Sequence, residues 1–273
     1  MKPDLLICWL KHNDYPLFRQ FLAKYRSFFG KVIIYFSEHN RFPYYDHFME
    51  QSMKDLDIIF LDPTFTDWSI GEDWRNHATN EMLKYSTSEW VCSVEQDWFS
   101  KDWDRLLETT EKAMNESDLT GWMNYTNASY IHPAYWFIKR ELLNKTGSDF
   151  TPHSEIDGAD HFGMVTYKAR ELGARILALQ DLGLKLDLST PDNTDAFHLG
   201  GVNQNYLDFE QRFQGSGIHR SEIFYVYNYF SMKSPVIQSP HFMERMKYVE
   251  PFLKELVGDL DPETSEWSKF FKL

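Results

Sequence analysis

Three short apolar runs near the start of the chain constrain its fold most strongly. Residues 5–10, 32–36 and 58–61 are almost wholly aliphatic or aromatic, as expected for strands that are buried on both faces of a sheet. Between the first two runs, residues 15–29 place apolar side chains at helical spacing, and Gly30 follows as a helix-ending residue. Because strands that alternate with helices pair in parallel, we expect an α/β fold with a mixed, mainly parallel sheet flanked by helices.

The length of the chain allows one large domain with an extension. Its 273 residues are 42% hydrophobic, which is enough to bury a sizeable core. Helical patterns recur late in the chain, at 206–213, 221–229 and 241–257. We therefore expect a main α/β domain over residues 1–200 and a helical C-terminal extension over 201–273, which packs on that domain and is a candidate for self-association.

Charge and cysteine content narrow the classes of protein. A formal charge of −13 disfavours a surface that neutralises many phosphates, so no nucleic-acid partner is expected. Cys8 and Cys92 lie in apolar runs, which is typical of reduced, buried thiols. The apolar run at 5–10 is too short for a signal sequence or a membrane span. We therefore expect a cytoplasmic protein with no transmembrane segment.

An acidic pair follows a fourth apolar strand. Residues 90–94 read as a buried strand, and Glu95 and Asp97 come directly after it. On an extended backbone these two side chains point to the same side. Their carboxylates could share a Mg²⁺ or Mn²⁺ ion, which takes oxygen ligands and keeps positions open for phosphate. An exposed strand end with solvated acids is the alternative, because a short acidic motif has little specificity by itself.

Polar residues also follow the first three strands. Lys11, Glu38 and Asp62 stand at or just beyond the ends of the three apolar runs. In open α/β sheets, ligands bind beyond the carboxyl ends of the strands. Each of the three is a candidate for contact with the base or ribose of a nucleotide, and a solvated loop residue is the alternative for each.

The segment from Arg75 to Asp97 resembles the centre of the GT-A glycosyltransferases, in particular the family 2-like enzymes. Those enzymes carry an Asn on a helix, then a small residue with Glu before a hydrophobic strand, then a D-x-D motif. Here Asn80, Ser88-Glu89 and residues 95–97 (Glu-Gln-Asp) follow in that order with matching spacing. The resemblance extends, as a pattern, over about residues 4 to 200.

Two departures from the family pattern affect this interpretation. Glu95 replaces the first Asp of the D-x-D motif, and Glu is itself a competent ligand for a hard cation. The Arg that usually precedes the helical Asn is Thr79 here, while Arg75 stands one helical turn earlier. The resemblance implies that Arg75 and Asn80 lie on the donor side of the site.

The resemblance implies a fold, a reaction and a metal. It implies a GT-A type, Rossmann-like domain that transfers a sugar from a nucleotide-sugar, UDP-linked in our interpretation, to a hydroxyl of a glycan or glycoside. Glu95 and Asp97 would hold Mn²⁺ or Mg²⁺. Some GT-A enzymes add a His after the core sheet, and His198, which stands before Gly200 and Gly201, has that position. Imidazole suits Mn²⁺ better than Mg²⁺, and a core or loop histidine is the alternative.

The family's catalytic base, in its inverting members, is an acid near the start of a later helix. Residues 155–163 are followed by a helical pattern, Gly173 and a basic residue before a strand, which is similar to the family's order. The resemblance places Asp160 at the base position and implies an inverting reaction. The alternative is that Asp160 caps the helix, because Asp accepts hydrogen bonds from free N–H groups at helix starts.

Aromatic residues flank the acidic pair along the sequence. Trp98, Trp122, Tyr125 and Trp136 are candidates for the acceptor side, because sugar rings present apolar C–H faces that pack on aromatic planes. The alternative for each is an ordinary core position.

Two other classes of protein remain compatible with the sequence. A nucleotidyltransferase also binds a metal-bound nucleotide on a related sheet, but residues 11–14 (Lys-His-Asn-Asp) are a poor substitute for its glycine-rich, basic loop. A catalytically silent protein that binds a nucleotide or a glycan is the second alternative. Release of UDP from a UDP-sugar in the presence of acceptor separates the transferase from the silent protein.

Overall fold

The computed structural model of the protein describes the parts of the chain that build the sheet and its helices. The described residues are 2–10, 16–37, 56–61, 73–96, 98–125, 129–151, 161–186 and 194–198.

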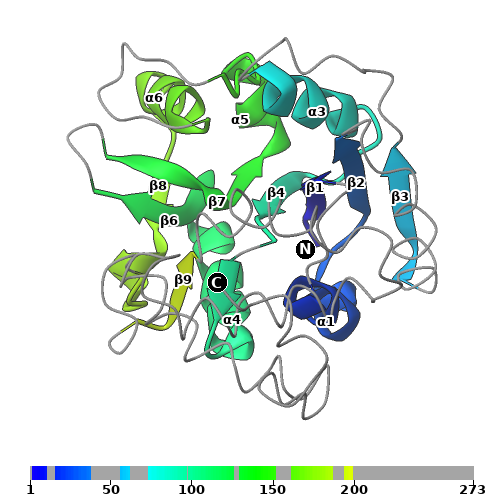
Figure 1. Ribbon diagram of the computed structural model, residues 1–273. Helices are drawn as coiled ribbons and strands as arrows, with labels where there is room; N and C mark the ends of the chain where they lie inside the picture. The colour runs from blue at the N-terminus through cyan, green and yellow to red at the C-terminus, as the bar shows by residue number, and fades with distance from the viewer. Residues whose placement is uncertain are drawn as a thin grey trace, which may run out of the picture.

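A seven-stranded sheet in the order β3-β2-β1-β4-β7-β6-β8 forms the centre of the described structure (Figure 1). Its strands are β1 (Asp4–Leu10), β2 (Val32–Ser37), β3 (Ile58–Leu61), β4 (Trp90–Val94), β6 (Leu119–Asn124), β7 (Tyr130–Lys139) and β8 (Ile176–Ala178). The pairs β1–β2, β2–β3, β1–β4 and β6–β8 are parallel. Strand β7 runs antiparallel to both β4 and β6. The predicted mixed, mainly parallel sheet is thus confirmed.

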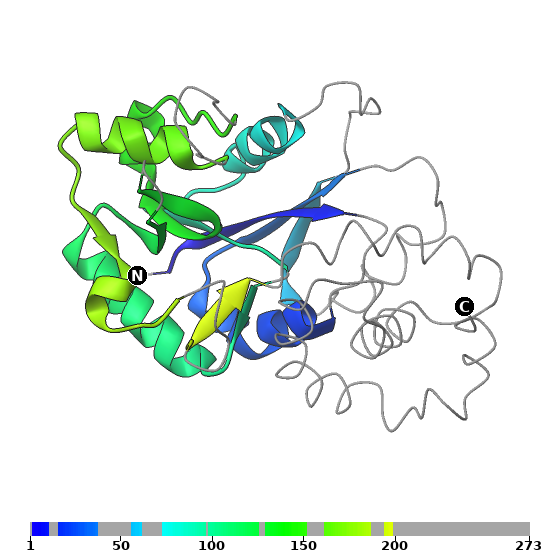
Figure 2. The same ribbon diagram turned by 60° about the vertical axis from the view of Figure 1, so that its left-hand side comes forward.

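Helices cover both faces of the sheet (Figure 2). Helices α1 (Pro16–Tyr25) and α4 (Trp103–Glu116) lie on one face, and α3 (Asp73–Leu83), α5 (Arg140–Lys145) and α6 (Gly163–Glu171) lie on the other. Because side chains alternate along a strand, each buried strand contributes to both layers. In β1, Leu5 and Ile7 join the core beneath α1 and α4, whereas Leu6 joins the core beneath α3, α5 and α6.

A second, two-stranded sheet extends from the end of the main one. Strands β5 (Trp98–Ser100) and β9 (Ala196–His198) pair antiparallel, with Trp98 opposite His198. Short 3₁₀ helices, η1 (Arg26–Phe28) and η4 (Leu179–Leu182), complete the described elements. The expected helical extension over 201–273 lies outside the described residues. Within the described ranges, no helix is long and apolar enough to cross a membrane.

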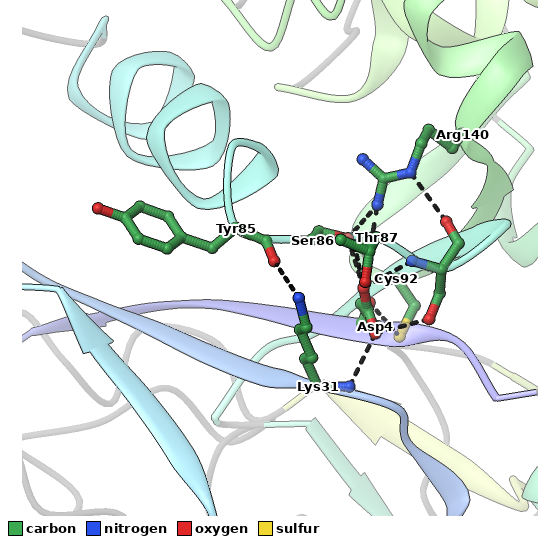
Figure 3. Close-up of polar contacts among 8 residues, drawn as sticks. Asp4, Lys31, Tyr85, Ser86, Thr87, Cys92 and Arg140 are labelled. Atoms are coloured by element: carbon green, nitrogen blue, oxygen red, sulfur yellow. Dashed lines mark hydrogen bonds and ion pairs between the residues drawn. The ribbon is translucent and has the colours of Figure 1, made fainter.

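A buried carboxylate ties the start of the sheet together (Figure 3). Asp4, at the first position of β1, is completely buried. It accepts hydrogen bonds from the backbone N–H of Lys31, Thr87 and Ser88 at 2.7, 2.7 and 2.9 Å, and from the hydroxyls of Ser86 and Ser88 at 2.7 Å. Arg140 Nη2 lies 3.9 Å from Asp4 Oδ2. The carboxylate therefore joins β1, the residue before β2, the turn before β4 and the start of α5.

The hydrogen bonds around Asp4 decide its charge state. Burial on its own raises the pKa of this carboxyl, but the hydrogen bonds from Lys31, Ser88 and Ser86 outweigh burial and lower the pKa to about 2. A carboxylate that accepts several N–H and O–H bonds is stabilised in its ionised form. Asp4 is therefore ionised at neutral pH.

Gly30→Ala should destabilise the protein through this network. A Cβ atom at position 30 would lie 2.6 Å from Asp4 Oδ1 and 2.9 Å from Ser88 Oγ, and neither atom can retreat without breaking hydrogen bonds. We expect the free energy of unfolding to fall by about 1–3 kcal/mol, as for other overpacked sites. Urea unfolding followed by circular dichroism measures this change, and an unchanged midpoint would contradict the tight packing around Asp4.

Candidate functional site

A small pocket lies where β1 and β4 end. It has a volume of about 50 Å³, and its lining comes from the end of β1, from α3, from β4 and its exit, from β7 and from the segment before α6. The polar side chains in its wall belong to Cys8, Arg75, Thr79, Ser93, Glu95, Gln96 and His161. The pocket thus occupies the carboxyl edge of the parallel strands, the usual place for a ligand in an open α/β sheet.

The exit of β4 is held in place by three hydrogen bonds. The N–H of Glu95 donates to Ala134 O at 2.9 Å, and the N–H of Trp98 donates back to Glu95 O at 3.0 Å. Gln96 Nε2 donates to Cys8 O at 2.6 Å, which connects the exit of β4 to that of β1. These bonds direct the chain from β4 into β5 through a turn that contains the acidic motif. Within that motif, Asp97 lies outside the described residues.

Glu95 meets a cation from helix α3. Arg75 Nη1 lies 2.8 Å from Glu95 Oε1. Their side chains are 35% and 17% exposed, respectively, so water screens the pair less than it would at an open surface. The structure thus brings together two of the residues predicted from the sequence, a carboxylate expected to bind metal and an arginine expected on the donor side.

The two cysteines are free. Cys92 is buried as expected, whereas Cys8 is only half-buried as a residue and lines the pocket. Burial raises the pKa of the Cys8 thiol to about 11, although the nearby Arg75 acts in the opposite direction. Cys8 therefore adds a neutral thiol to the wall of the pocket.

Asn80 holds the wall of the pocket together. Its Nδ2 donates to Asn76 O and Asn76 Oδ1 at 2.9 Å and to Ser148 O at 3.1 Å. Asn76 Oδ1 also accepts from the N–H of Phe150 at 3.1 Å. In this conformation the Asn80 amide fastens α3 to the segment 148–150, whose Phe150 lines the pocket.

The predicted acceptor aromatics differ in exposure. Trp98, Trp122 and Trp136 are only 3, 4 and 3% exposed, whereas Tyr125 is 62% exposed. The Trp98 ring lies 5.2 Å from that of Trp122, and Trp136 stacks on Phe162 at 4.5 Å. The three indoles therefore pack in the hydrophobic core. Of the four, Tyr125 presents its ring to solvent. Trp136 is buried and forms part of the wall of the pocket.

The remaining predicted residues are placed only in part. The backbone of His198 pairs with that of Trp98, the residue that follows Asp97 in the sequence; the position of its imidazole is not described. Lys11, Glu38, Asp62 and Asp160 lie outside the described residues. The described residues contain no group of three or more metal-binding side chains. Of the three predicted ligands, only the side chain of Glu95 is described.

The start of helix α6 is relevant to the alternative in which Asp160 caps this helix. The N-cap residue of α6 is Phe162, which makes no side-chain capping bond. Asp160 stands two positions earlier in the sequence, outside the described residues. The residue after it, His161, lines the pocket and bonds through Nδ1 with Phe150 O at 3.2 Å.

Two residues of the site were not predicted from the sequence. Gln96 stands between the two acids of the motif, and its side chain joins the exit of β4 to β1. Asn76 lies one helical turn before Asn80 and accepts from it. That spacing is the only sequence signal for the pair, and it becomes informative only when the segment 148–150 is known to pass beside α3.

Comparison with known proteins identifies the fold. No protein-family model and no curated protein matches the chain. Among solved structures, the mannosyltransferase PcManGT from Pyrobaculum calidifontis, in complex with GDP-Man and Mn²⁺, is 14% identical with a TM-score of 0.50. The match covers 95% of this chain and 77% of that one. TarS 1–349 from S. aureus is 14% identical with a TM-score of 0.45, and the match covers 98% and 78% of the two chains.

The third comparison involves another class of enzyme. The 4-diphosphocytidyl-2C-methyl-D-erythritol synthase from Anaerococcus prevotii is 11% identical with a TM-score of 0.43, and the match covers 65% of this chain and 87% of that one. Of these three, the mannosyltransferase alone reaches a TM-score of 0.50, and at 14% identity the likeness concerns the fold. The described domain has the GT-A type fold that the sequence predicted.

Proposed function

We propose that the protein is a metal-dependent glycosyltransferase. In this proposal it moves a sugar from a nucleotide-sugar, UDP-linked, to a hydroxyl of a glycan or glycoside. The observation that carries the proposal is the pocket at the carboxyl edge of a GT-A sheet, where Glu95 leaves β4 and faces Arg75. A carboxylate and a guanidinium side by side suit a metal-bound diphosphate, which needs an anionic ligand for the metal and a cation for the phosphates.

The metal would be held at the exit of β4. Glu95, Asp97 and His198 are the proposed ligands, and a carboxylate-rich set with one imidazole fits Mn²⁺ or Mg²⁺. Arg75 already places a cation at the Glu95 carboxylate, so this position favours positive charge. When bound, the metal would neutralise charge on the departing diphosphate.

The other residues divide between the two substrates. Arg75 and Asn80, with Lys11, Glu38 and Asp62 at the strand exits, are proposed to face the nucleotide. Asp160 is proposed as the general base that takes the proton of the acceptor hydroxyl in an inverting reaction. It directly precedes His161, which lines the pocket, and this adjacency supports the assignment.

The acceptor is proposed to approach from the aromatic side of the site. Tyr125 is the exposed member of the four aromatic candidates, and its hydroxyl lies 3.4 Å from Asp181 Oδ1. An exposed ring beside a carboxylate suits a hydroxyl-rich sugar, with the ring packing on its C–H face. Trp98, Trp122 and Trp136 would support this region from the core.

One experiment tests the reaction class. The protein is incubated with single nucleotide-sugars, Mn²⁺ and a panel of glycosides, and release of the nucleoside diphosphate is measured with and without acceptor. Acceptor-dependent release supports the glycosyltransferase. Formation of a nucleotide-sugar from a sugar phosphate and a nucleoside triphosphate would show a nucleotidyltransferase instead. Binding of ligands with no turnover would show a silent binding protein.

Asp97→Asn should remove the Mn²⁺-dependent part of UDP affinity. The amide keeps the size of the side chain but removes the charge that attracts a hard cation. Isothermal titration with UDP, with and without Mn²⁺, measures the difference. Asp104→Asn is the matched control, because its side chain is 67% exposed and its ion-pair partner is Lys24 on the surface. Equal Mn²⁺ dependence in the two variants would exclude Asp97 as a ligand.

A further inference from the structure

Arg75 forms an ion pair with Glu95, whose carboxylate is a metal ligand in the proposed function. Arg75 Nη1 lies 2.8 Å from Glu95 Oε1, and the pair forms part of the pocket wall. Helix α3, which supplies Arg75, is tied to the segment 148–150 through Asn80 and Asn76. The pair therefore connects two well-fixed backbones, β4 and α3, through one long and rotatable side chain.

A divalent cation at Glu95 would change the electrostatics of this pair. Both the metal and the guanidinium are positive, and like charges a few ångströms apart in a half-buried site repel each other. The attraction that holds Arg75 on Glu95 without metal would thus be weakened by a metal on the same carboxylate. A side chain that is 35% exposed has room to turn toward another anion.

We propose that Arg75 and the divalent cation compete for Glu95, and that Arg75 moves from Glu95 to the diphosphate when the nucleotide arrives with its metal. The inference rests on the proposed function and deepens it. Arg suits both positions, because its planar guanidinium forms charge-assisted bonds with carboxylates and with phosphates alike.

Two consequences follow for binding. Metal alone binds weakly, since it must displace Arg75 from the ion pair with Glu95. Nucleotide and metal bind with positive coupling, because the diphosphate offers the displaced guanidinium an anion, and the coupling is the same whichever ligand binds first. Arg75 is in this sense a positioning residue that makes the site selective for the metal–nucleotide pair over free metal.

Arg75→Gln tests the competition, because the two affected affinities should change in opposite directions. In the full chain, we expect affinity for Mn²⁺ alone to rise about 10-fold, within the range of roughly 5- to 150-fold that is usual for coupled sites. Affinity for UDP in the presence of Mn²⁺ should fall by a similar factor. Free Mn²⁺, measured by electron paramagnetic resonance, gives the first quantity, and isothermal titration gives the second.

Three controls isolate the Arg75–Glu95 pair. Lys84→Gln removes one positive charge directly after the same helix, but Lys84 pairs with Glu81, so Mn²⁺ affinity should stay at the parent value. Arg75→Lys keeps the cation and should bind Mn²⁺ nearly as weakly as the parent. In the Glu95→Gln background, Arg75→Gln should bring no gain. Thermal unfolding of each variant confirms that the fold is retained.

The outcomes separate this inference from the proposed function. Unchanged or weaker Mn²⁺ binding by Arg75→Gln overturns the competition, as does a gain that persists in the Glu95→Gln background or appears equally in Lys84→Gln. A gain confined to Arg75→Gln, with UDP bound by none of the variants, supports the competition and overturns the UDP-linked donor of the proposed function. A gain together with weaker UDP binding supports both.

Discussion

Asp160→Asn should lower the rate of sugar transfer by at least about 10², because general-base catalysis contributes about 10²–10⁴ in rate. The amide cannot take a proton from the acceptor hydroxyl. Stability should stay near the parent's, since Asn and Asp serve about equally well at a helix start. Affinity for the donor should also be retained, because the base acts on the acceptor. Initial transfer rates measured beside a melting curve and a UDP titration test these three expectations together.

Asp157→Asn is the matched control for this variant. It makes the same change three positions earlier, in the same segment before α6. If Asp160 is the base, the control should transfer sugar at about the parental rate. A fully active Asp160→Asn variant would contradict the assignment, and it would direct attention to Asp157 and Glu155 as the next acids in the sequence.

Asp4→Ala should have the largest effect on stability. It removes an acceptor that serves the backbone N–H of Lys31, Thr87 and Ser88 and two serine hydroxyls. Donors left unsatisfied in the interior cost about 1–3 kcal/mol each, and breaking a buried charge network costs about 3–5 kcal/mol. We therefore expect the free energy of unfolding to fall by about 3 kcal/mol or more. Guanidinium unfolding measures it, with the exposed Asp104→Asn as control.

The same carboxylate predicts how stability depends on pH. Asp4 has a pKa of about 2 in the folded protein, against a reference value of 3.8. A depressed pKa stabilises the fold fully above the reference value, and this contribution is lost as the pH falls from 3.8 toward 2. It amounts to about 2 kcal/mol by the conversion of pKa difference to free energy. The difference in unfolding free energy between the parent and Asp4→Ala should therefore shrink across this interval. A difference that stays constant would contradict an ionised Asp4.

The sequence predicted the central strands well because their signal is local. β1, β2 and β3 coincide with the three apolar runs near the start of the chain. The three strands pair in parallel, as expected. β7 begins at Tyr130 and contains Pro133. The His132-Pro133 pair reads as a break, yet Pro133 falls where the register between β6 and β7 shifts, and an irregular ladder tolerates a residue without an N–H.

The site was predictable in its residue types and not in its contacts. The acidic motif at 95–97 marks the exit of β4, because carboxylates directly after a buried strand are conspicuous in the sequence. The contact between Arg75 and Glu95 depends on how α3 lies over the sheet, which no local pattern encodes. The exposure of the aromatics also depends on tertiary packing, since Trp122 in a buried strand has the same composition signal as a ring in a groove.

The pairing of β5 with β9 has a consequence for the timing of assembly on the ribosome. Trp98 and His198 are one hundred residues apart in the sequence, which corresponds to about 5–20 seconds of synthesis at usual elongation rates. The strands that frame Arg75 and Glu95 emerge well before the strand that bears His198. A nascent chain would thus display Arg75 and Glu95 while β5 still lacks its neighbour. For that interval β5 offers an unpaired edge, the kind of surface that chaperones shield.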